Sequence, residues 1–535
     1  MRSKTKVVTV EIEDTKFPAK GVAHCEGNTF TIKGAIIGEK LKVSGGRKRN
    51  GIIEGKILER LAPSPLSTEE GCPHRPECGG CLYDSLPYDV ELREKERELK
   101  ALFLEYEKII QVSRPFFYRN KMEFTFGNLE KDGELTLGLH ARGMFHKILP
   151  VENCKICDKD FITIRNATEK FFRLKKIPFY HRKNNTGTLR HLMIRKAKNT
   201  GEILLLLSHT DFELPLYEWI STLETLPLLG KIVSVYHIIN NDVGDTIKGE
   251  PLLLFGKNTI TEKLSGLSFN ISPFSFFQTN TEGAEKLYTL ALDAISDICK
   301  KTVFDLYSGT GTIASIVSRK AKKVFAVELV EEAVNEAKKS AEKNGIDNVE
   351  FLQGDVFKVI DSIKEKADLI IVDPPREGLV EKSLRKISNF KAPEILYISC
   401  NPTTLVRDIA LLKEEGYTVK KIFGLDMFPR TSNVETVALL SKLDVDKHIN
   451  VEIKLDELDL TSAESKATYA QIKEYILEKF DLKVSTLYIA QIKKKCGIVL
   501  REHYNKSKKE KQVIPQCTPE KEEAIMDALR HFKMI

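Results

Sequence analysis

The second half of this sequence predicts an α/β fold, a doubly wound and mainly parallel sheet, and three observations carry that prediction. From about residue 272 to 443, strand-like apolar runs alternate with amphipathic helical stretches, as in βαβ units. The first run, TVFDLY, leads at once into the glycine-rich turn SGTG and a helical stretch. The next runs end in acidic residues, at the sheet edge where parallel strands form a ligand crevice: Glu328, Asp355 and Asp373.

Other regions flank this α/β domain, which we place at residues 272–443. Residues 1–62 alternate short apolar runs with glycine-rich turns, the pattern of a small all-β barrel. Residues 63–271 are rich in strand-like runs, and a charged helix expected over 88–110 would pack on the α/β domain. Residues 444–535 show two helical patterns and predict a small helical extension without recognisable chemistry.

Composition and charge restrict the class of protein. The chain is 42% hydrophobic and 30% charged, which suits a folded protein rather than a disordered one. The net charge of +7 is concentrated at the ends, with 13 basic against 7 acidic residues in 1–60 and 11 against 6 in 491–535. Basic ends are often only solvated surface, but here a hairpin tip, SGGRKRNG, also presents Arg47, Lys48 and Arg49 for phosphate contact.

No apolar run approaches the roughly 18–20 residues of a membrane span, and the N-terminus lacks the apolar stretch of a signal peptide. These features predict a cytoplasmic protein whose ten cysteines stay reduced unless they bind metal or take part in chemistry. A monomer is the default expectation.

The glycine-rich turn and the acidic strand ends favour a nucleoside ligand without phosphates. Glycines let the backbone turn sharply and approach a ligand, and Glu328 at the end of the second strand could accept both ribose hydroxyls. Asp355, at the end of the third strand, would lie within reach of an adenine. The turn lacks the third glycine of dinucleotide sites and the Lys-Ser/Thr of a P-loop, so an adenosyl ligand fits better than a pyrophosphate. A plain tight turn is the alternative.

Two further residues are placed for covalent chemistry. Cys400, in the strand end ISCNP, would lie in the crevice just before a helix, beside the polar Ser399 and Asn401, as a nucleophile would. A buried structural thiol is the alternative. Glu435 lies inside an apolar strand, where a carboxylate has a raised pKa and suits a general base, unless an ion pair gives it a structural role.

Together these motifs resemble the S-adenosylmethionine-dependent methyltransferases of Rossmann-like fold, and among them the RNA uracil-5-methyltransferases. The shared motifs are FFQTN, DLYSGTGT, DPPR, SCNP and SNVETV, in the order and spacing of that family. The resemblance extends over about residues 1–443, and the N-terminal barrel is similar to the family's RNA-binding TRAM domain, which is OB-like. It implies S-adenosylmethionine as the methyl donor, contacted by Gln278, Tyr307, Glu328, Asp373 and Asp355.

The resemblance also implies a mechanism and an RNA substrate. Cys400 would add to carbon-6 of a uracil, carbon-5 would take the methyl group, and Glu435 would remove the carbon-5 proton. Members often carry His two residues before this glutamate, whereas this chain has Asn433, so a charged role for that neighbour is in doubt. We expect 23S ribosomal RNA as the substrate, because members with both a barrel and a cysteine cluster resemble the large-subunit ribosomal enzymes; transfer RNA is the alternative.

A cysteine cluster, GCPHRPECGGC, predicts a metal site. Three closely spaced cysteines in a cytosolic chain, here Cys72, Cys78 and Cys81, suggest a metal more than a disulfide. A closed site needs a fourth ligand, which would be Cys154 or Cys157. The family resemblance selects Cys154, and a [4Fe-4S] cluster as the metal group. Zinc is the physical alternative, since four thiolates also suit a tetrahedral ion.

Two other functions remain open at this point. Methylation of an amino group, which DPP-type motifs also serve, would predict an aromatic residue after the prolines, where this chain has Arg376. A non-catalytic RNA-binding protein with a metal staple is the second. Both would leave Cys400 and Glu435 without a role.

Overall fold

The computed structural model describes residues 7–68, 71–75, 77–359, 362–442, 469–482, 484–496, 518–532 and 534. The chain divides into two compact units, Met1–Val445 and Asp446–Ile535, and each is described by itself. The first unit contains three large sheets, of six, seven and eight strands. No helix in the described ranges is long and apolar enough to cross a membrane.

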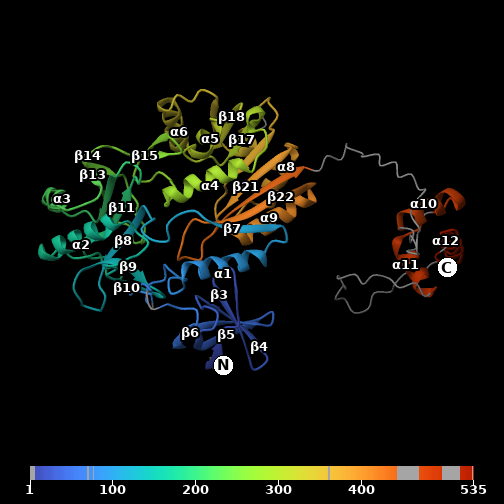
Figure 1. Ribbon diagram of the computed structural model, residues 1–535, viewed down its shortest axis with the longest axis horizontal. Helices are drawn as coiled ribbons and strands as arrows, with labels where there is room; N and C mark the ends of the chain where they lie inside the picture. Colours follow the sequence, from blue (N-terminus) through green and yellow to red (C-terminus); the bar gives the residue numbers. More distant parts are fainter. Residues whose placement is uncertain are drawn as a thin grey trace. The chain divides into compact units, whose positions relative to one another are not determined.

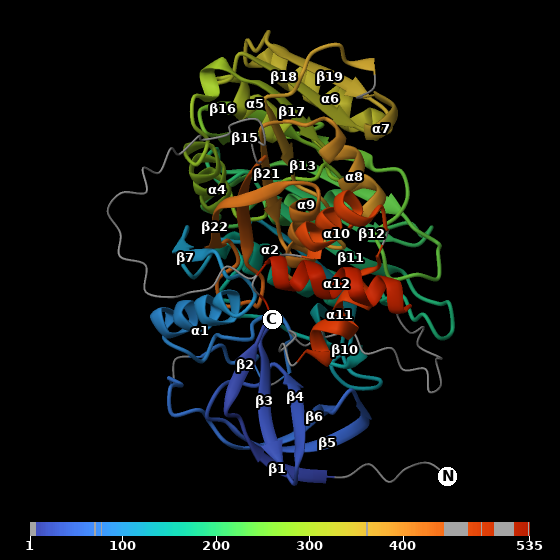
Figure 2. The same ribbon diagram turned by 90° about the vertical axis from the view of Figure 1, so that its right-hand side faces the viewer.

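The six-stranded sheet, in the order β1-β5-β6-β4-β3-β2, encloses a core of its own (Figure 2). Side chains along β1 alternate between exposed and buried, as expected for a strand with one face on a core. The turn between β5 and β6 is Asn50–Gly51, both with positive φ, so Lys48 and Arg49 lie in the strand beside the turn rather than at its tip. The strands are β1 (Val7–Glu11), β2 (Asp14–Lys16), β3 (Lys20–Cys25), β4 (Asn28–Lys33), β5 (Lys40–Arg49) and β6 (Ile52–Ala62).

The seven-stranded sheet has the order β10-β9-β8-β11-β12-β13-β14. Two helices pack on one of its faces, α2 (Lys159–Leu174) and α3 (Leu216–Glu224), around the fully buried Trp219. The sequence pattern indicated strands and turns here and missed both helices. The strands are β8 (Lys121–Gly127), β9 (Thr136–Ala141), β10 (Met144–Leu149), β11 (Leu189–Lys196), β12 (Glu202–His209), β13 (Lys231–Ile239) and β14 (Leu252–Gly256).

The helix expected over residues 88–110 is wrong in its second half. Helix α1 (Tyr88–Lys100) ends at Lys100, and residues Tyr106–Gln111 form strand β7, which pairs in parallel with β22 (Tyr417–Asp426). The alternating β-branched sequence YEKIIQ suits an edge strand, and pairing with β22 gives its backbone partners that a helix would not need.

The eight-stranded sheet has the order β19-β18-β17-β20-β21-β23-β22-β7, and its first five strands are parallel (Figure 1). The α/β prediction for this half of the chain is therefore confirmed. The chain order of the strands reverses beside β17, which opens a crevice at the carboxyl ends of β17 and β20. The remaining strands are β17 (Thr302–Leu306), β18 (Lys323–Glu328), β19 (Val349–Gln353), β20 (Leu369–Val372), β21 (Glu394–Ser399) and β23 (Glu435–Lys442).

Hydrophobic cores lie on both faces of this sheet. On one face pack three helices and the hairpin β15 (Ile260–Leu264) and β16 (Leu267–Ile271), and on the other pack α1 and three more helices. The hairpin is tied to the end of α6 by hydrogen bonds between Ser268 and Asn344, so packing of this part extends N-terminal to residue 272. The helices are α4 (Thr281–Asp293), α5 (Thr312–Ser318), α6 (Glu331–Lys343), α7 (Val356–Val359), α8 (Glu381–Asn389) and α9 (Pro402–Glu414).

The second unit is a small helical domain with its own core. Helices α10 (Tyr469–Phe480), α11 (Thr486–Lys495) and α12 (Pro519–His531) pack together mainly through buried isoleucines and alanines. The two helical patterns of the sequence, over residues 463–480 and 519–532, correspond to α10 and α12, although residues 463–468 lie outside the described residues. Helix α11 was missed, because its basic end obscured its apolar face.

Candidate active site and a thiol-lined cavity

A cavity of about 630 Å³ opens at the carboxyl ends of β17, β20 and β21. It lies at the crevice where the strand order reverses, which is the expected ligand position in an open α/β sheet. Most of the predicted site residues meet there, although they are spread over nearly 160 positions in the sequence. Its lining includes Gln278, Tyr307, Asp373, Arg376, Cys400 and Glu435.

The glycine-rich turn forms one wall of this cavity. Tyr307, Gly309 and Gly311 all have positive φ, so the chain turns tightly from β17 into α5. A Cβ atom at Gly311 would lie 2.6 Å from the Phe351 ring and 2.9 Å from Cβ of Ala337, so only glycine fits this position. The turn places Tyr307 and residues 308–310 in the lining of the cavity.

Two predicted donor contacts do not reach the described lining of the cavity. Glu328 ends β18, and its carboxylate accepts hydrogen bonds from the backbone N–H groups of Gly309 (2.9 Å) and Val330 (3.0 Å). It therefore holds the glycine-rich turn in place from behind. Asp355 follows β19 and is exposed, and its backbone carbonyl accepts from the N–H groups at the end of α7.

Gln278 is held at the opposite wall by a network of asparagines. Asn280 caps α4 by accepting from the N–H of Gly283 (3.0 Å), and its amide donates to the backbone carbonyl of Met427 (2.8 Å). Asn120 donates to the carbonyl of Gln278 itself (3.3 Å). These contacts join the segment before α4 both to the seven-stranded sheet and to the segment that follows β22.

Cys400 lies between β21 and α9, half-buried in the cavity. The side chain of Asn401 caps α9 by accepting from Thr403 N–H, which fixes the backbone next to the thiol. Burial raises the pKa of the Cys400 thiol to about 11, and the nearby Glu435 carboxylate adds to this shift. Arg376 opposes it through its positive charge and a hydrogen bond to the sulfur. Arg376 therefore favours the thiolate, a role that the sequence pattern did not reveal.

Two carboxylic acids, Asp373 and Glu435, line the catalytic cavity. Burial raises the pKa of Glu435 to about 8, with a further contribution from Asp373, while Arg376 lowers it. Burial also raises the pKa of Asp373 to about 7. A glutamate with a pKa near the working pH can accept a proton and return it, as a general base must.

These raised pKa values predict that the free protein loses stability as the pH rises. A carboxyl group whose pKa is higher in the folded than in the unfolded chain, where it is about 4.3, stabilises the fold at low pH. For Glu435 this contribution is lost progressively as the pH rises from about 4.3, and the loss is complete above about 8. Thermal unfolding between pH 5 and 9 should therefore show a smaller fall in Tm for E435Q than for the native protein. Parallel curves for the two proteins would contradict a raised pKa at Glu435.

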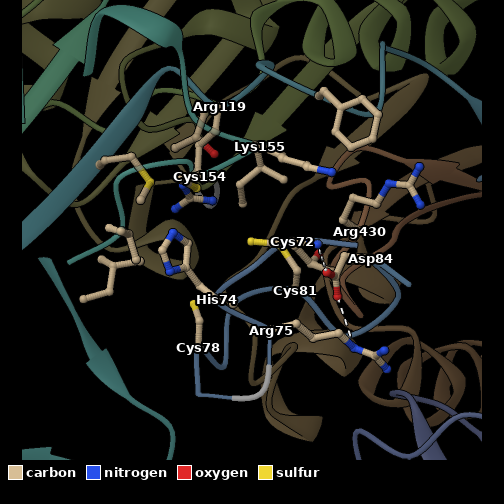
Figure 3. Close-up of a pocket in the computed structure, with 18 of the residues that line it drawn as sticks. Cys72, His74, Arg75, Cys78, Cys81, Asp84, Arg119, Cys154, Lys155 and Arg430 are labelled. Atoms are coloured by element: carbon tan, nitrogen blue, oxygen red, sulfur yellow. Dashed lines mark hydrogen bonds and ion pairs between the residues drawn. The ribbon is translucent and has the colours of Figure 1, made fainter. Parts of the chain in front are cut away.

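A second cavity, of about 490 Å³, is lined by the four predicted cysteine ligands Cys72, Cys78, Cys81 and Cys154 (Figure 3). Their thiols come from the loop before α1 and from the segment before α2, and they meet around one space although they are more than 70 residues apart. Cys157, the alternative ligand, is buried and donates to the backbone carbonyl of Cys154 (3.7 Å) instead. We call this space the thiol cavity.

The thiol cavity shows no preformed metal site. Among the described residues, no group of three or more histidine, cysteine or acidic side chains is arranged to hold a metal ion. Arg430 also lines this cavity, and its buried Nε has no hydrogen-bond partner in the part of the chain that the structure describes.

The two cavities share a wall. Arg119, Thr279 and Asn433 line both of them. Asn433 replaces the histidine that the family resemblance led us to look for, and it lies between the thiols on one side and Glu435 on the other. The sequence offered no sign that these two sites are neighbours.

The chain is similar to proteins of one enzyme family over most of its length. A family model described as tRNA (Uracil-5-)-methyltransferase matches residues 249–443. An uncharacterized RNA methyltransferase of Clostridium tetani is 43% identical over 450 residues, which cover 82% of this chain and 99% of that protein. A second one, from Clostridium acetobutylicum, is 45% identical over 442 residues, covering 81% and 96%.

A solved structure is similar over the same extent. The crystal structure of Pyrococcus abyssi tRNA (uracil-54, C5)-methyltransferase in complex with S-adenosyl-L-homocysteine has a TM-score of 0.66 and 27% sequence identity, and covers 81% of this chain and 99% of that one. The match of motifs, cavity and fold agrees with these comparisons. The chain belongs to the RNA uracil-5-methyltransferase family.

Proposed function

We propose that this protein transfers a methyl group from S-adenosylmethionine to carbon-5 of a uridine in 23S ribosomal RNA. One observation carries the proposal: a nucleophile, a buried carboxylic acid and the glycine-rich turn line the same cavity, as Cys400, Glu435 and residues 307–310. Amino methylation would use neither Cys400 nor Glu435, and the residue after the prolines is Arg376, not an aromatic one.

Cys400 begins the reaction. Carbon-5 of uracil is too weak a nucleophile to attack a methyl group directly, so the Cys400 thiolate adds to carbon-6 and turns carbon-5 into an enolate-like carbon. Arg376 supports this step, because its positive charge lowers the pKa of the thiol against the effect of burial. Bound S-adenosylmethionine supplies an electrophilic methyl group on sulfur, and carbon-5 takes it.

Glu435 completes the reaction. Its carboxylate takes the proton from carbon-5, the double bond between carbon-5 and carbon-6 re-forms, and Cys400 leaves as the thiolate. Asp373 lies close enough to raise the pKa of Glu435, which makes that carboxylate a stronger base. The burial of Glu435 also excludes water from the reacting atoms.

The donor contacts are assigned to five residues. Gln278, Tyr307 and Asp373 line the cavity. Glu328 accepts two backbone hydrogen bonds, and each carboxylate oxygen retains a lone pair that can accept from a ribose hydroxyl. Asp355 is the fifth, next to the adenine position expected at the end of β19.

The six-stranded sheet is proposed to be the RNA-binding TRAM-like domain, residues 1–62. Its exposed Lys48 and Arg49 flank the hairpin turn, where they can contact phosphates. Transfer RNA is the second candidate substrate, because the similar Pyrococcus abyssi enzyme is described as acting on uracil-54 of tRNA.

The deciding experiment is nucleoside mass spectrometry on unmodified 23S ribosomal RNA and on bulk transfer RNA, each incubated with S-adenosylmethionine and the purified protein. New 5-methyluridine in the ribosomal RNA alone is the expected result. Methylation of transfer RNA alone would support the proposed reaction but would contradict 23S ribosomal RNA as the substrate. A different methylated nucleoside would overturn the proposed roles of Cys400 and Glu435.

We also propose that the thiol cavity binds a [4Fe-4S] cluster through Cys72, Cys78, Cys81 and Cys154. The expected result is that protein purified without oxygen contains iron and acid-labile sulfide in equal amounts, and that C154A loses both. The matched variant C157A should retain them, because that thiol is turned toward the chain. Stoichiometric zinc without sulfide would favour a single metal ion instead.

A further inference from the structure

The segment 427–434, between β22 and β23, forms the wall between the two cavities. Phe428 and Asn433 line the catalytic cavity, whereas Arg430, Thr431 and Asn433 line the thiol cavity. Glu435 follows this segment directly. The position of the proposed base therefore depends on how the wall is held.

Arg430 is the point at which the wall is attached to the loop of the cysteine cluster. Its backbone carbonyl accepts hydrogen bonds from the N–H groups of Leu82 (2.9 Å) and Tyr83 (3.1 Å), directly after Cys81. Its own N–H donates to Oε1 of Glu91 on α1 (2.6 Å). The cysteine-bearing loop, α1 and the segment 427–434 thus meet at one residue.

The side chain of Arg430 strengthens the same attachment. It is only 5% exposed, and Nη1 donates to the backbone carbonyl of Leu86 (2.7 Å) and lies 3.3 Å from Oε2 of Glu91. The guanidinium group also lies over the rings of Phe116 (4.8 Å) and Tyr88 (5.3 Å). A planar guanidinium can make these contacts together, whereas a lysine ammonium could keep the charge but not the stacking.

The backbone of Arg430 is held in a conformation that arginine rarely adopts. Its φ is +71°, in the left-handed region, which costs an ordinary residue of the order of 1 kcal/mol. Glycine would adopt this φ without strain. An arginine at this position indicates that its side-chain contacts outweigh that cost.

We propose that Arg430 is a positioning residue for Glu435, and that it couples the order of the cysteine-bearing loop to proton removal from the substrate. This inference rests on the proposed function. Arg430 does not line the catalytic cavity; it fixes the wall, so that the Glu435 carboxylate points at carbon-5. The step that depends on it is the last one, in which Glu435 takes the carbon-5 proton and the bond from Cys400 to carbon-6 breaks.

The test is to look for a stalled covalent complex. With uridine RNA and S-adenosylmethionine, R430Q should accumulate an enzyme–RNA adduct on a denaturing gel, because addition and methyl transfer proceed while release is slow. We expect kcat to fall by roughly tenfold to a hundredfold, the effect of a misplacement of about 1 Å, with KM for S-adenosylmethionine within about twofold of the native value. R430K, which retains the charge near Glu91, should recover part of kcat and show less adduct.

Two further variants separate positioning from general loss of structure. R430G keeps the backbone conformation without strain, so it should fold and still accumulate adduct. R190K makes the same substitution as R430K at another buried arginine, which lines neither cavity. Arg190 donates to the backbone carbonyls of Asn240, Asp242 and Gly244, and R190K should show no adduct.

The outcomes are distinct. Native turnover by R430Q and R430G, or loss of turnover without adduct in both, would overturn the positioning role. If neither the native protein with 5-fluorouridine RNA nor E435Q with uridine RNA forms an adduct, the proposed function itself is wrong, and the role of Arg430 with it.

Discussion

Replacing Cys400 with alanine is expected to abolish methylation of RNA, with a loss on the order of a thousandfold or more, because the variant has no nucleophile to activate carbon-5. The change removes one sulfur atom from a half-buried position, so the fold should be retained. Covalent capture on 5-fluorouridine RNA should disappear as well. The native protein should form that complex and hold it, since fluorine cannot be taken from carbon-5 as a proton is.

The matched control is C299A, which removes an exposed thiol in the short turn before β17. It should methylate and be captured at the native rate. A C400A protein that methylates RNA at the native rate would exclude the addition mechanism. It would also bring back the alternative in which Cys400 is structural and the protein acts through RNA binding.

Replacing Glu435 with glutamine should stop the reaction one step later. Glutamine has nearly the same shape but cannot accept the carbon-5 proton, so methylation should proceed to the covalent adduct and turnover should fall by roughly 10²- to 10⁴-fold. The measurement pairs the rate of 5-methyluridine release with the amount of RNA bound to protein under denaturing conditions. C400A should give neither product nor adduct, whereas E435Q should give adduct without product.

A control for the loss of a carboxylate is E394Q. Glu394 is the first residue of β21, at the end of the strand opposite the crevice, and it forms an ion pair with Lys301 (2.5 Å). This variant should methylate RNA at the native rate and should accumulate no adduct. Loss of the adduct as well as the product in E435Q would mean that Glu435 acts before methyl transfer rather than after it.

Much of the candidate site could be predicted from the sequence because parallel strands bring their carboxyl ends together. Asp373 and Cys400 each follow an apolar run, and the sheet places those ends side by side. Gln278 and Glu435 lie outside the parallel strands. Glu435 was recognisable as a carboxylate inside an apolar strand, whereas only the family resemblance drew attention to Gln278. All four residues line the same cavity.

The remainder depended on contacts between distant segments, which local patterns do not encode. Helices α2 and α3 lie among strands of similar hydrophobicity, so their period was hidden, and β7 was read as the end of a helix. Glu328 was expected to face a ligand, but its nearest donors are backbone N–H groups of the turn that it supports. The attachment of the shared wall depends on contacts between residues 82–86 and Arg430, which no local sequence pattern encodes.

The pairing of β7 with β22 has a consequence for how this protein is made. Residues 106–111 leave the ribosome long before residues 417–426, yet they form the outermost strand of the same sheet. The catalytic half cannot be completed during synthesis of its own sequence alone; it must recruit a strand made some 300 residues earlier, and such distant pairings form slowly. A fragment beginning at residue 272 would leave the edge of β22 open to association with other chains. The catalytic half is therefore not expected to form its complete sheet when it is separated from residues 106–111.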